Sequence, residues 1–362
     1  MDRGPEAVID LAALRHNLNA LSKAAGKPVI AVVKADAYGH GAIEVARVLE
    51  KEKGKIFALA VAFLSEAKHL REAGIKLPIL VLFDNEAPEE FIKYGLTPVL
   101  QSVKAARAFS KKALSMGVEL RAHVKIDTGM GRMGIPWAGA TQALSEIIPL
   151  PGIKMEGLMS HISESAPGAI DFARFQIGRF RQLKKDLAAK GIKPLCHIAG
   201  SASALILPEA RMDAVRVGLL MYGGRPYVSA GGVFKPVMKV KSRLILAKKM
   251  KKGEAVSYDR TFIAARNSVI GVAAVGYADG YPRALSNRAH MLVKGQRAPV
   301  CGRVCMDLTV LDITGLSGAA EGAEAVLLGG GLTASELAEW AGTNPYEIMT
   351  SLGRGARRSY VV

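Results

Sequence analysis

The chain has 362 residues, of which 50% are hydrophobic and 22% charged, as expected for a folded protein with one large domain and a smaller one. Its net charge of +17 comes from dispersed Lys and Arg without interleaved aromatic residues, so we expect a solvated basic surface and no nucleic-acid partner. No apolar run reaches the roughly 18 residues of a membrane span, and the first residues, MDRGPEAVID, lack a signal-peptide pattern, so we expect a cytoplasmic protein that does not bind membranes.

Short apolar runs rich in β-branched residues recur along residues 1 to about 230, with amphipathic stretches between them. The runs are mostly continuous, which predicts parallel strands covered on both faces. Eight such strands alternating with helices predict an N-terminal (β/α)8 TIM-type barrel. The predicted strands are Pro28–Val33, Ile56–Val61, Pro78–Leu82, Thr97–Leu100, Val118–Ile126, Ile153–Ser160, Pro194–Ala199 and Asp213–Val217, and the predicted helices include Asp10–Ala24, Val103–Met116 and Asp171–Lys190.

The pattern changes near residue 234, where short strand-like runs separated by turns predict a mainly β C-terminal domain. We assign residues 1–234 to the barrel and 235–362 to the β domain, with SAGGVFKP (229–236) as the connection. The first nine or so residues are assigned to pack with the β domain. The predicted elements are strands Lys239–Ala247, Ser268–Val275, His290–Val293, Ala298–Cys301, Leu308–Ile313 and Ala325–Leu328, and helices Thr333–Ala341 and Pro345–Leu352.

The chain contains three cysteines, Cys196, Cys301 and Cys305. An odd, low count in a chain of this length argues against a disulfide framework. The C-x3-C spacing of the last two is not a zinc pattern, and no second pair accompanies it. We therefore expect small core residues at these positions and no metal site.

Polar residues stand at five of the predicted strand ends. In a β/α barrel, the carboxyl ends of the strands form one rim that carries the active site. A lysine at the end of an apolar run has a depressed pKa and can form a Schiff base, and small residues late in the barrel can cradle a phosphate. This combination suggests pyridoxal phosphate as the cofactor. The residues are Lys34, Asp127, Arg132, His161, His197, Ser201 and Arg216.

Several segments, in the same chain order, resemble the signature segments of the alanine racemase family. They cover essentially the whole chain and include one in the predicted β domain. The segments are VIDLAALRHNLNAL, AVVKADAYGHG, KIDTGMGRMG, GLMSHIS, HIAGSAS, VRVGLLMYG, AVGYADGYPR and GRVCMD. The resemblance implies a barrel followed by a β domain, and a homodimer whose partner subunit completes each active site.

The resemblance also implies a reaction, the interconversion of L-alanine and D-alanine through an external aldimine of pyridoxal phosphate. Lys34 would hold the cofactor as the internal aldimine and act as one acid/base group. Tyr277, supplied by the other subunit, would act on the opposite face of the substrate, as racemisation requires. Arg216 would contact the pyridine nitrogen, and its positive charge would disfavour ring protonation and suppress transamination.

The remaining roles come from the same resemblance. Tyr38, Ser201 and the backbone of Gly218 and Leu219 would hold the phosphate. Arg132 would orient the cofactor's phenolic oxygen and, with the backbone N–H of Met306 beside Asp307, the substrate carboxylate. His161 would hydrogen-bond Tyr277, and His197 would support Arg216. Lys125 matches a position that is carbamylated in some members of the family.

The chain departs from the family pattern at three positions, and other readings stay open. Asp36 and Gly200 stand where the family often has asparagine, and Arg354 stands where some members have a phosphate-binding tyrosine. Glu156 and Asp171 receive no role. The alternatives are a broad-specificity or serine racemase, a non-catalytic carrier of pyridoxal phosphate, and a decarboxylase of the same build. GYADG argues against the carrier and Arg216 against the decarboxylase.

Overall fold

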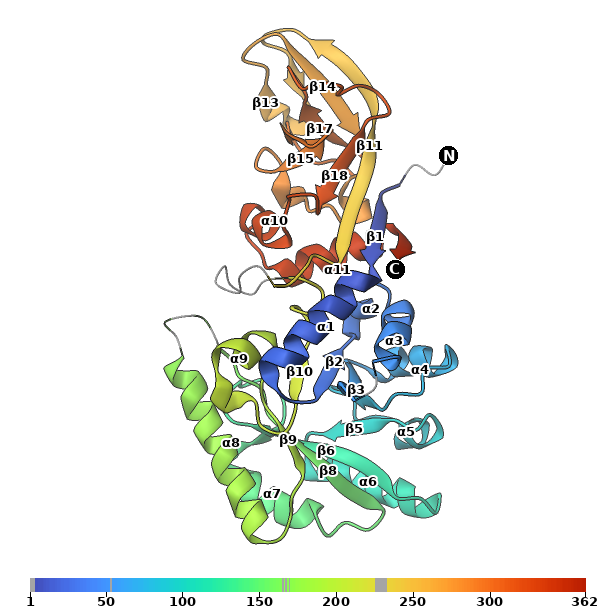
Figure 1. The fold of residues 1–362 in the computed structure, drawn as a ribbon, viewed down its shortest axis with the longest axis vertical. Helices are drawn as coiled ribbons and strands as arrows, with labels where there is room; N and C mark the ends of the chain where they lie inside the picture. Colours follow the sequence, from blue (N-terminus) through green and yellow to red (C-terminus); the bar gives the residue numbers. More distant parts are fainter. Residues whose placement is uncertain (1–3, 53, 165, 167, 169, 225–232) are drawn as a thin grey trace.

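A computed structural model describes the chain apart from residues 1–3, 53, 165, 167, 169 and 225–232. Figure 1 shows two stacked parts, a barrel of strands and helices and a mainly β domain above it. The first half of the predicted connection, 229–232, lies outside the described residues, and the boundary between 234 and 235 stays a prediction. Just after that gap, the backbone N–H of Lys235 donates to Oδ1 of the buried Asn17 at 2.8 Å.

The lower part is a nearly closed barrel of eight parallel strands, which confirms the predicted barrel. Their order around the sheet is β10-β2-β3-β4-β5-β6-β8-β9. Two backbone hydrogen bonds cross the gap between the last and first strands, from Asp213 to the Cys196 carbonyl (2.9 Å) and from Arg216 to the Ala199 carbonyl (3.0 Å). The strands are β2 (Val29–Val32), β3 (Ile56–Val61), β4 (Ile79–Val81), β5 (Thr97–Leu100), β6 (Leu120–Asp127), β8 (Ile153–Met159), β9 (Leu195–His197) and β10 (Val215–Val217), and the short β7 (Ile135–Pro136) pairs with β6.

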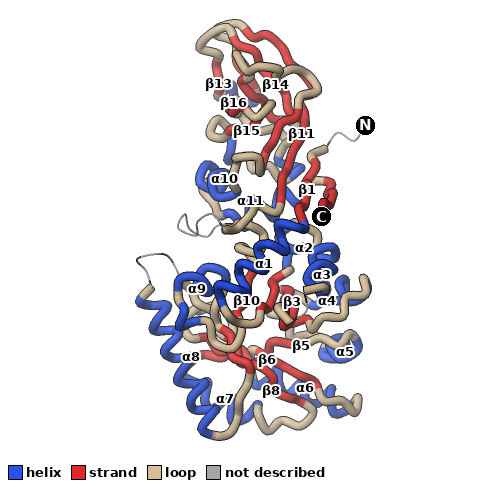
Figure 2. Tube along the Cα trace, viewed as in Figure 1, coloured by secondary structure: helices blue, strands red, loops and turns tan. Residues whose placement is uncertain are grey.

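Helices surround the barrel strands, as the blue and red tubes of Figure 2 show. Their apolar stripes are buried against the strands, which is why the i, i+3, i+4 pattern predicts them. Asp10 begins the first helix, because its carboxylate accepts the backbone N–H of Ala13 at 2.7 Å. The helices are α1 (Leu11–Ala25), α3 (Ala42–Glu50), α4 (Leu64–Glu72), α5 (Pro88–Lys93), α6 (Val103–Ser115), α7 (Ala140–Ile147), α8 (Asp171–Ala189) and α9 (Ser201–Ile206), with 3-10 turns η1 (Trp137–Gly139) and η2 (Pro208–Ala210).

The upper part is built on the long strand β11 (Met238–Met250), which pairs with β1, β14 and β18. The first strand of the chain, β1 (Glu6–Asp10), lies in this sheet between β11 and the last strand, β19 (Arg357–Val361). The remaining elements are β12 (Ala255–Val256), β13 (Phe262–Ile263), β14 (Ser268–Ala273), β15 (His290–Val293), β16 (Gln296–Pro299), β17 (Thr309–Asp312), β18 (Glu324–Leu328), α10 (Ala334–Ala341), α11 (Pro345–Gly355), η3 (Tyr258–Arg260), η4 (Tyr277–Asp279) and η5 (Arg283–Leu285).

The described residues contain no helix long and apolar enough to cross a membrane. Within the same residues, no three His, Cys, Asp or Glu side chains are grouped so as to hold a metal ion. All three cysteines are free; Cys196 and Cys301 are buried and Cys305 is half-buried.

Candidate active site

A cavity of about 330 Å³ opens at the carboxyl ends of the barrel strands. Parallel strands bring their ends to one rim, so residues that are distant in sequence meet there. Most of the residues predicted for the site line this cavity. They are Lys34, Tyr38, Lys125, Arg132, His161, Ser201, Arg216, Gly218 and Leu219.

The segment after β2 is a left-handed turn, labelled α2 (Lys34–Tyr38) in Figure 1. The four residues from Ala35 to Tyr38 have φ between 52° and 55°. This conformation costs an L-residue about 1–2 kcal/mol, so neighbouring groups must hold it in place. The turn brings both Lys34 and Tyr38 to the cavity wall.

Two carboxylates hold the turn. Asp36 accepts the backbone N–H of Ala42 at 2.7 Å and forms an ion pair with Arg358 of β19. Glu66, on α4, accepts the backbone N–H of Ala35 at 2.6 Å and that of Ala62 at 2.6 Å. These bonds tie the segment that carries Lys34 to the neighbouring helix and to the β domain. An aspartate at position 36 therefore has a structural role in this chain.

The cavity is strongly cationic. Lys34, Lys125, Arg132 and Arg216 line it, and none of its described lining residues is Asp or Glu. Burial, followed by the charge of Arg132, lowers the pKa of Lys34. Burial, with Arg132 and Arg216 next, lowers the pKa of Lys125 from 10.5 to about 8. This set of donors suits a ligand that carries phosphate and carboxylate groups.

Arg216, at the centre of β10, is almost fully buried and held by neutral acceptors. Its Nη1 donates to Nδ1 and the carbonyl oxygen of His197, at 2.7 and 2.9 Å. Its Nη2 donates to the carbonyl oxygens of Ser160 and Ile198, at 2.6 and 3.2 Å, and to Nδ1 of His161 at 3.1 Å. Burial lowers its pKa from 12.5 to about 9, so the guanidinium remains charged at neutral pH. His197 does not line the cavity; it lies behind Arg216.

Tyr38, Ser201 and Gly218 meet at one end of the cavity. The hydroxyl of Ser201 accepts the backbone N–H of Gly218 at 3.0 Å, which leaves its own proton available for a ligand. A Cβ atom at position 218 would overlap the hydroxyl of Tyr38, so only glycine lets the two segments approach this closely. Burial raises the pKa of Tyr38, which keeps its hydroxyl a neutral donor.

Tyr277 and Met306 lie in the β domain and do not line the cavity of their own chain. They are neighbours, because the backbone N–H of Tyr277 donates to the Cys305 carbonyl and that of Ala278 to the Met306 carbonyl, both at 3.0 Å. Tyr277 is 43% exposed and Met306 54%. The fold of one chain therefore presents the two residues together on its surface.

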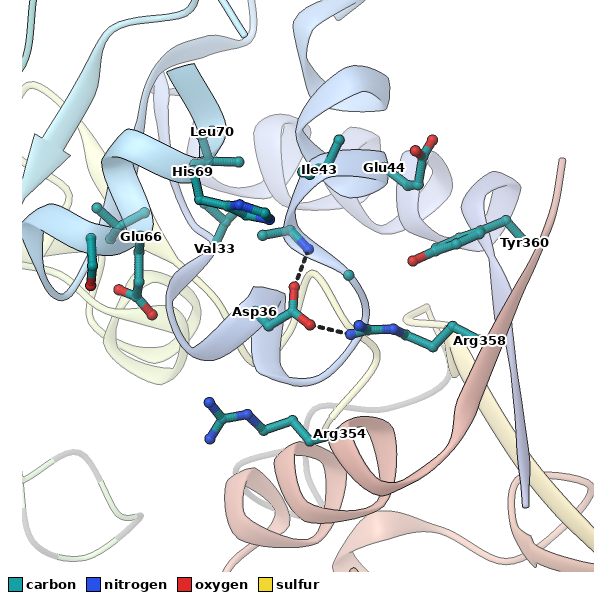
Figure 3. Close-up of a pocket in the computed structure, with 14 residues that line it drawn as sticks. Val33, Asp36, Ile43, Glu44, Glu66, His69, Leu70, Arg354, Arg358 and Tyr360 are labelled. Atoms are coloured by element: carbon teal, nitrogen blue, oxygen red, sulfur yellow. Dashed lines mark hydrogen bonds and ion pairs between the residues drawn. The ribbon is translucent and has the colours of Figure 1, made fainter. Parts of the chain in front are cut away.

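Arg354 lies away from the Lys34 cavity. It lines a second cavity of about 480 Å³ between α3, α4 and the end of the chain, together with Asp36 and Arg358. Figure 3 shows Arg354 projecting from α11, while Arg358 points toward Asp36. The wall of this second cavity contains neither Lys34 nor Arg216, so position 354 does not contribute to the Lys34 cavity.

Sequence reasoning missed several residues around the site. Phe83, after β4, places its ring centroid 5.5 Å from Nζ of both Lys34 and Lys125. Tyr346 of α11 lines the cavity, with its ring 5.7 Å from that of Tyr38. His123 is fully buried, with Nδ1 2.8 Å from Nε2 of His197. The sequence could have indicated His123, since strand periodicity places it on the same face of β6 as Lys125.

Comparisons of the sequence with known families match the whole of this architecture. Residues 9–226 match the model of the alanine racemase N-terminal domain, and residues 237–360 match that of the alanine racemase C-terminal domain. The chain is 44% identical over 371 residues to an alanine racemase of Thermodesulfovibrio yellowstonii, covering 100% of this chain and 99% of the relative.

Solved structures agree with these sequence matches. The fold superimposes on alanine racemase of Clostridium difficile 630 with a TM-score of 0.92 and 33% identity, covering 100% of this chain and 96% of the other. It also superimposes on alanine racemase of Bartonella henselae with covalently bound pyridoxal phosphate, with a TM-score of 0.90 and 26% identity, covering 99% of this chain and 100% of the other.

Proposed function

The chain belongs to the alanine racemase family, and from that premise we propose that it interconverts L-alanine and D-alanine with pyridoxal phosphate as cofactor. The observation that carries the proposal is the charge of the Lys34 cavity. Four cationic side chains line it without an acidic one among its described residues. A phosphate and an amino-acid carboxylate would together balance this charge.

The cavity residues fit the cofactor. The amine of Lys34 would hold it covalently, and Arg216 would face its ring nitrogen. Tyr38, Ser201, Gly218 and Leu219 would hold the phosphate at the end of the cavity where they meet. When bound, the cofactor supplies an electron sink that makes the α-proton of an attached amino acid acidic.

Lys34 would move a proton on one face of the substrate. Its lowered pKa increases the fraction of free amine near neutral pH, which is the form that can accept a proton. Arg132 would orient the substrate carboxylate. Its charge also contributes to the lowered pKa of Lys34, so one side chain supports both binding and proton transfer.

The second acid/base group would be Tyr277 of the partner subunit, in a homodimer with shared sites. Two observations support this assignment: Tyr277 is exposed in its own chain, and Met306 lies beside it. His161 can donate a hydrogen bond to that tyrosine. Burial, followed by Arg216, lowers the pKa of His161 to about 3, and its Nδ1 accepts from Arg216, so Nε2 carries its proton and is free to donate. The backbone N–H of Met306 would bind the substrate carboxylate.

Lys125 is a candidate for carbamylation. Its pKa of about 8, against the ordinary 10.5, raises the neutral fraction near neutral pH, and the neutral amine is the form that adds carbon dioxide. Addition of carbon dioxide to the neutral amine forms an N–C bond, releases one proton and leaves a carbamate anion; counted from the ammonium form, two protons are released. That anion would neutralise part of the charge around Arg132.

The test is hydrogen exchange at Cα. Purified protein with pyridoxal phosphate is incubated with L-alanine in heavy water, and we expect D-alanine with deuterium at Cα. Absence of both product and exchange, in folded protein that binds the cofactor, would refute the proposed function. Faster exchange with serine than with alanine would move the substrate assignment to serine.

A further inference from the structure

A file of polar side chains runs from the Lys34 cavity through the barrel and ends at the half-buried Glu156. Nη1 of Arg216 lies 2.7 Å from Nδ1 of His197, and Nε2 of His197 lies 2.8 Å from Nδ1 of His123. Nε2 of His123 lies 3.8 Å from Oε2 of Glu156. Both imidazoles are fully buried, so water does not complete their hydrogen bonds from outside. The proposed reaction uses only the Arg216 end of this file.

The hydrogen bonds of the file fit one arrangement of the imidazole protons. A guanidinium has donors only, so while Arg216 keeps this orientation Nδ1 of His197 accepts and the proton of His197 lies on Nε2. That Nε2–H donates to Nδ1 of His123, whose own proton must then lie on Nε2, toward Glu156. Each link therefore determines the next, from a cation at the cavity to a carboxylate at the other end of the file.

The charges along the file support this order. Burial, followed by the charge of Arg216, lowers the pKa of His197 well below 6.5, and burial lowers that of His123 although Glu156 opposes it. Both imidazoles are therefore neutral near pH 7. His123 and Arg121 lower the pKa of Glu156 despite its partial burial, so that residue carries its negative charge. Glu156 is the only carboxylate that the described chain brings to the file.

The local backbone is arranged for these contacts. The register of β6 against β8 shifts between Ala122 and His123, so that His123 lies opposite Gly157 and Glu156 is displaced from regular pairing. A Cβ atom on Gly157 would overlap the His123 ring. Nη1 of Arg121 donates to Oε1 of Glu156 at 2.9 Å, which leaves Oε2 facing the imidazole. A glycine and a strand irregularity thus make room for a histidine beside a carboxylate.

We propose that Glu156, acting through His123, is a positioning residue that keeps the proton of His197 on Nε2 and so holds Arg216 in one orientation at the cavity. If the proton of His197 moved to Nδ1, two donors would face each other and the 2.7 Å bond to Arg216 would be lost. At 3.8 Å, Glu156 acts through its charge, which favours an N–H on the imidazole nitrogen that faces it. The proposal rests on the proposed function only where it relates Arg216 to the cofactor.

The first experiment locates the proton on each imidazole ring directly. Long-range ¹H–¹⁵N correlation of the full chain, labelled with ¹⁵N-histidine and recorded with and without pyridoxal phosphate, identifies the protonated nitrogen of each imidazole. The signals of His123 are assigned as those that are absent from the His123→Gln variant. We expect His197 and His123 to be neutral and protonated on Nε2 near pH 7. A proton on Nδ1 of either residue would overturn the proposal, whether or not the chain proves to be a racemase.

The second experiment removes the charge at the end of the file. Glu156→Gln is compared with Glu156→Asp, which keeps the charge, and with Glu146→Gln, which removes an exposed charge paired with Arg107. In Glu156→Gln we expect both forms of His197 and a kcat lower by about tenfold or more with KM nearly unchanged, the scale seen when a group that orients a catalytic side chain is lost. Glu156→Asp should retain the Nε2 form, and Glu146→Gln should match the parent.

Parent-like spectra and kcat in a folded Glu156→Gln variant would refute the positioning role while leaving the proposed function intact. A parent that shows the expected proton order but no racemisation would instead refute the proposed function. If Glu156→Gln does not fold, His123→Gln, which removes the imidazole between Glu156 and His197, decides the question: both forms of His197 would support the positioning role, and His197 protonated on Nε2 alone would refute it.

Discussion

Arg216 donates from Nη1 to Nδ1 of His197 over 2.7 Å, in a part of the barrel from which water is excluded. The acceptors that the described residues bring to this guanidinium are carbonyl oxygens and imidazole nitrogens, so these groups solvate its charge without neutralising it. A cation held in this way still acts electrostatically on a group bound in the cavity. The ring nitrogen proposed to face it would then be difficult to protonate.

Replacing Arg216 by Glu reverses the sign of the charge proposed to face the ring nitrogen of the cofactor. A cation about 4 Å from a protonated ring nitrogen disfavours it by roughly 4 kcal/mol at an effective dielectric near 20, and a carboxylate would favour it instead. We expect slower racemisation and at least a tenfold rise in transamination per turnover, measured as pyruvate formed from alanine. Arg107→Glu, on the exposed face of α6, is the control. Clean racemisation by a folded Arg216→Glu variant would contradict this account of Arg216.

Replacing Lys125 by Met removes a buried ammonium. Its folded pKa of about 8 lies below the ordinary 10.5, so the unfolded chain binds more protons between these values and stability rises with pH across that window. Below pH 8, the buried charge costs roughly 3 kcal/mol. Without bicarbonate, we therefore expect Lys125→Met to be more stable than the parent by up to about this amount, with the gap closing toward pH 10.5.

The measurement is urea unfolding at several pH values, with and without bicarbonate. Lys185→Met, at an exposed position of α8, controls for the loss of one charge. If Lys125 is carbamylated, bicarbonate should stabilise the parent and reduce the gap, and should leave Lys125→Met unchanged. If the difference in free energy of unfolding between Lys125→Met and the parent does not vary with pH, the ammonium of Lys125 is not destabilised in the folded chain.

Asp36 should stabilise the left-handed turn that carries Lys34. Its carboxylate accepts from Ala42 at 2.7 Å and pairs with Arg358. Asp36→Ala loses both contacts and should reduce the free energy of unfolding by about 2 kcal/mol, while Asp36→Asn keeps an acceptor for Ala42 and should lose about half of that. Chemical denaturation measures the stability, and fluorescence titration measures cofactor affinity. Equal stability of all three proteins would rule out this role.

Gly157 and Gly178 offer a matched pair of substitutions. Gly157→Ala would press a methyl group against His123 and should cost about 1–3 kcal/mol. Gly178 lies within α8, and a Cβ atom there would meet nothing within 4 Å outside its own helix, so Gly178→Ala should stabilise the chain by up to about 1 kcal/mol. Thermal unfolding distinguishes the two. Similar effects of both substitutions would mean that the contact with His123 is not tight.

The barrel was predictable because most of its strands are buried on both faces and therefore consist of continuous apolar runs, although β6 and β8 also carry charged residues. β3 and β5 have the predicted bounds. β1 and β19 were not predicted as strands, since both are short, carry charged residues and pair across nearly the full length of the chain. β11 extends to Met250, beyond the predicted Ala247, because both faces of the strand are exposed near this end and can carry Lys248 and Lys249.

The residues that converge on the cavity were predictable because the rim of a barrel collects strand ends. Glu156 was not, since the shifted register of β6 against β8 turns it toward His123 and strand periodicity does not predict such a shift. Phe83 carries no polar group that would single it out. Arg354 was left without a role, and its position in the second cavity depends on how α11 packs against the barrel.

The central claim is that each active site combines Lys34 of one subunit with Tyr277 of the other, and complementation tests it most directly. Lys34→Ala and Tyr277→Phe variants, each inactive alone, are mixed under conditions in which subunits exchange. We predict recovery of about a quarter of the parent activity, since half of the dimers are then hybrids and each hybrid has one intact site. A mixture that forms hybrid dimers yet stays inactive would contradict the claim.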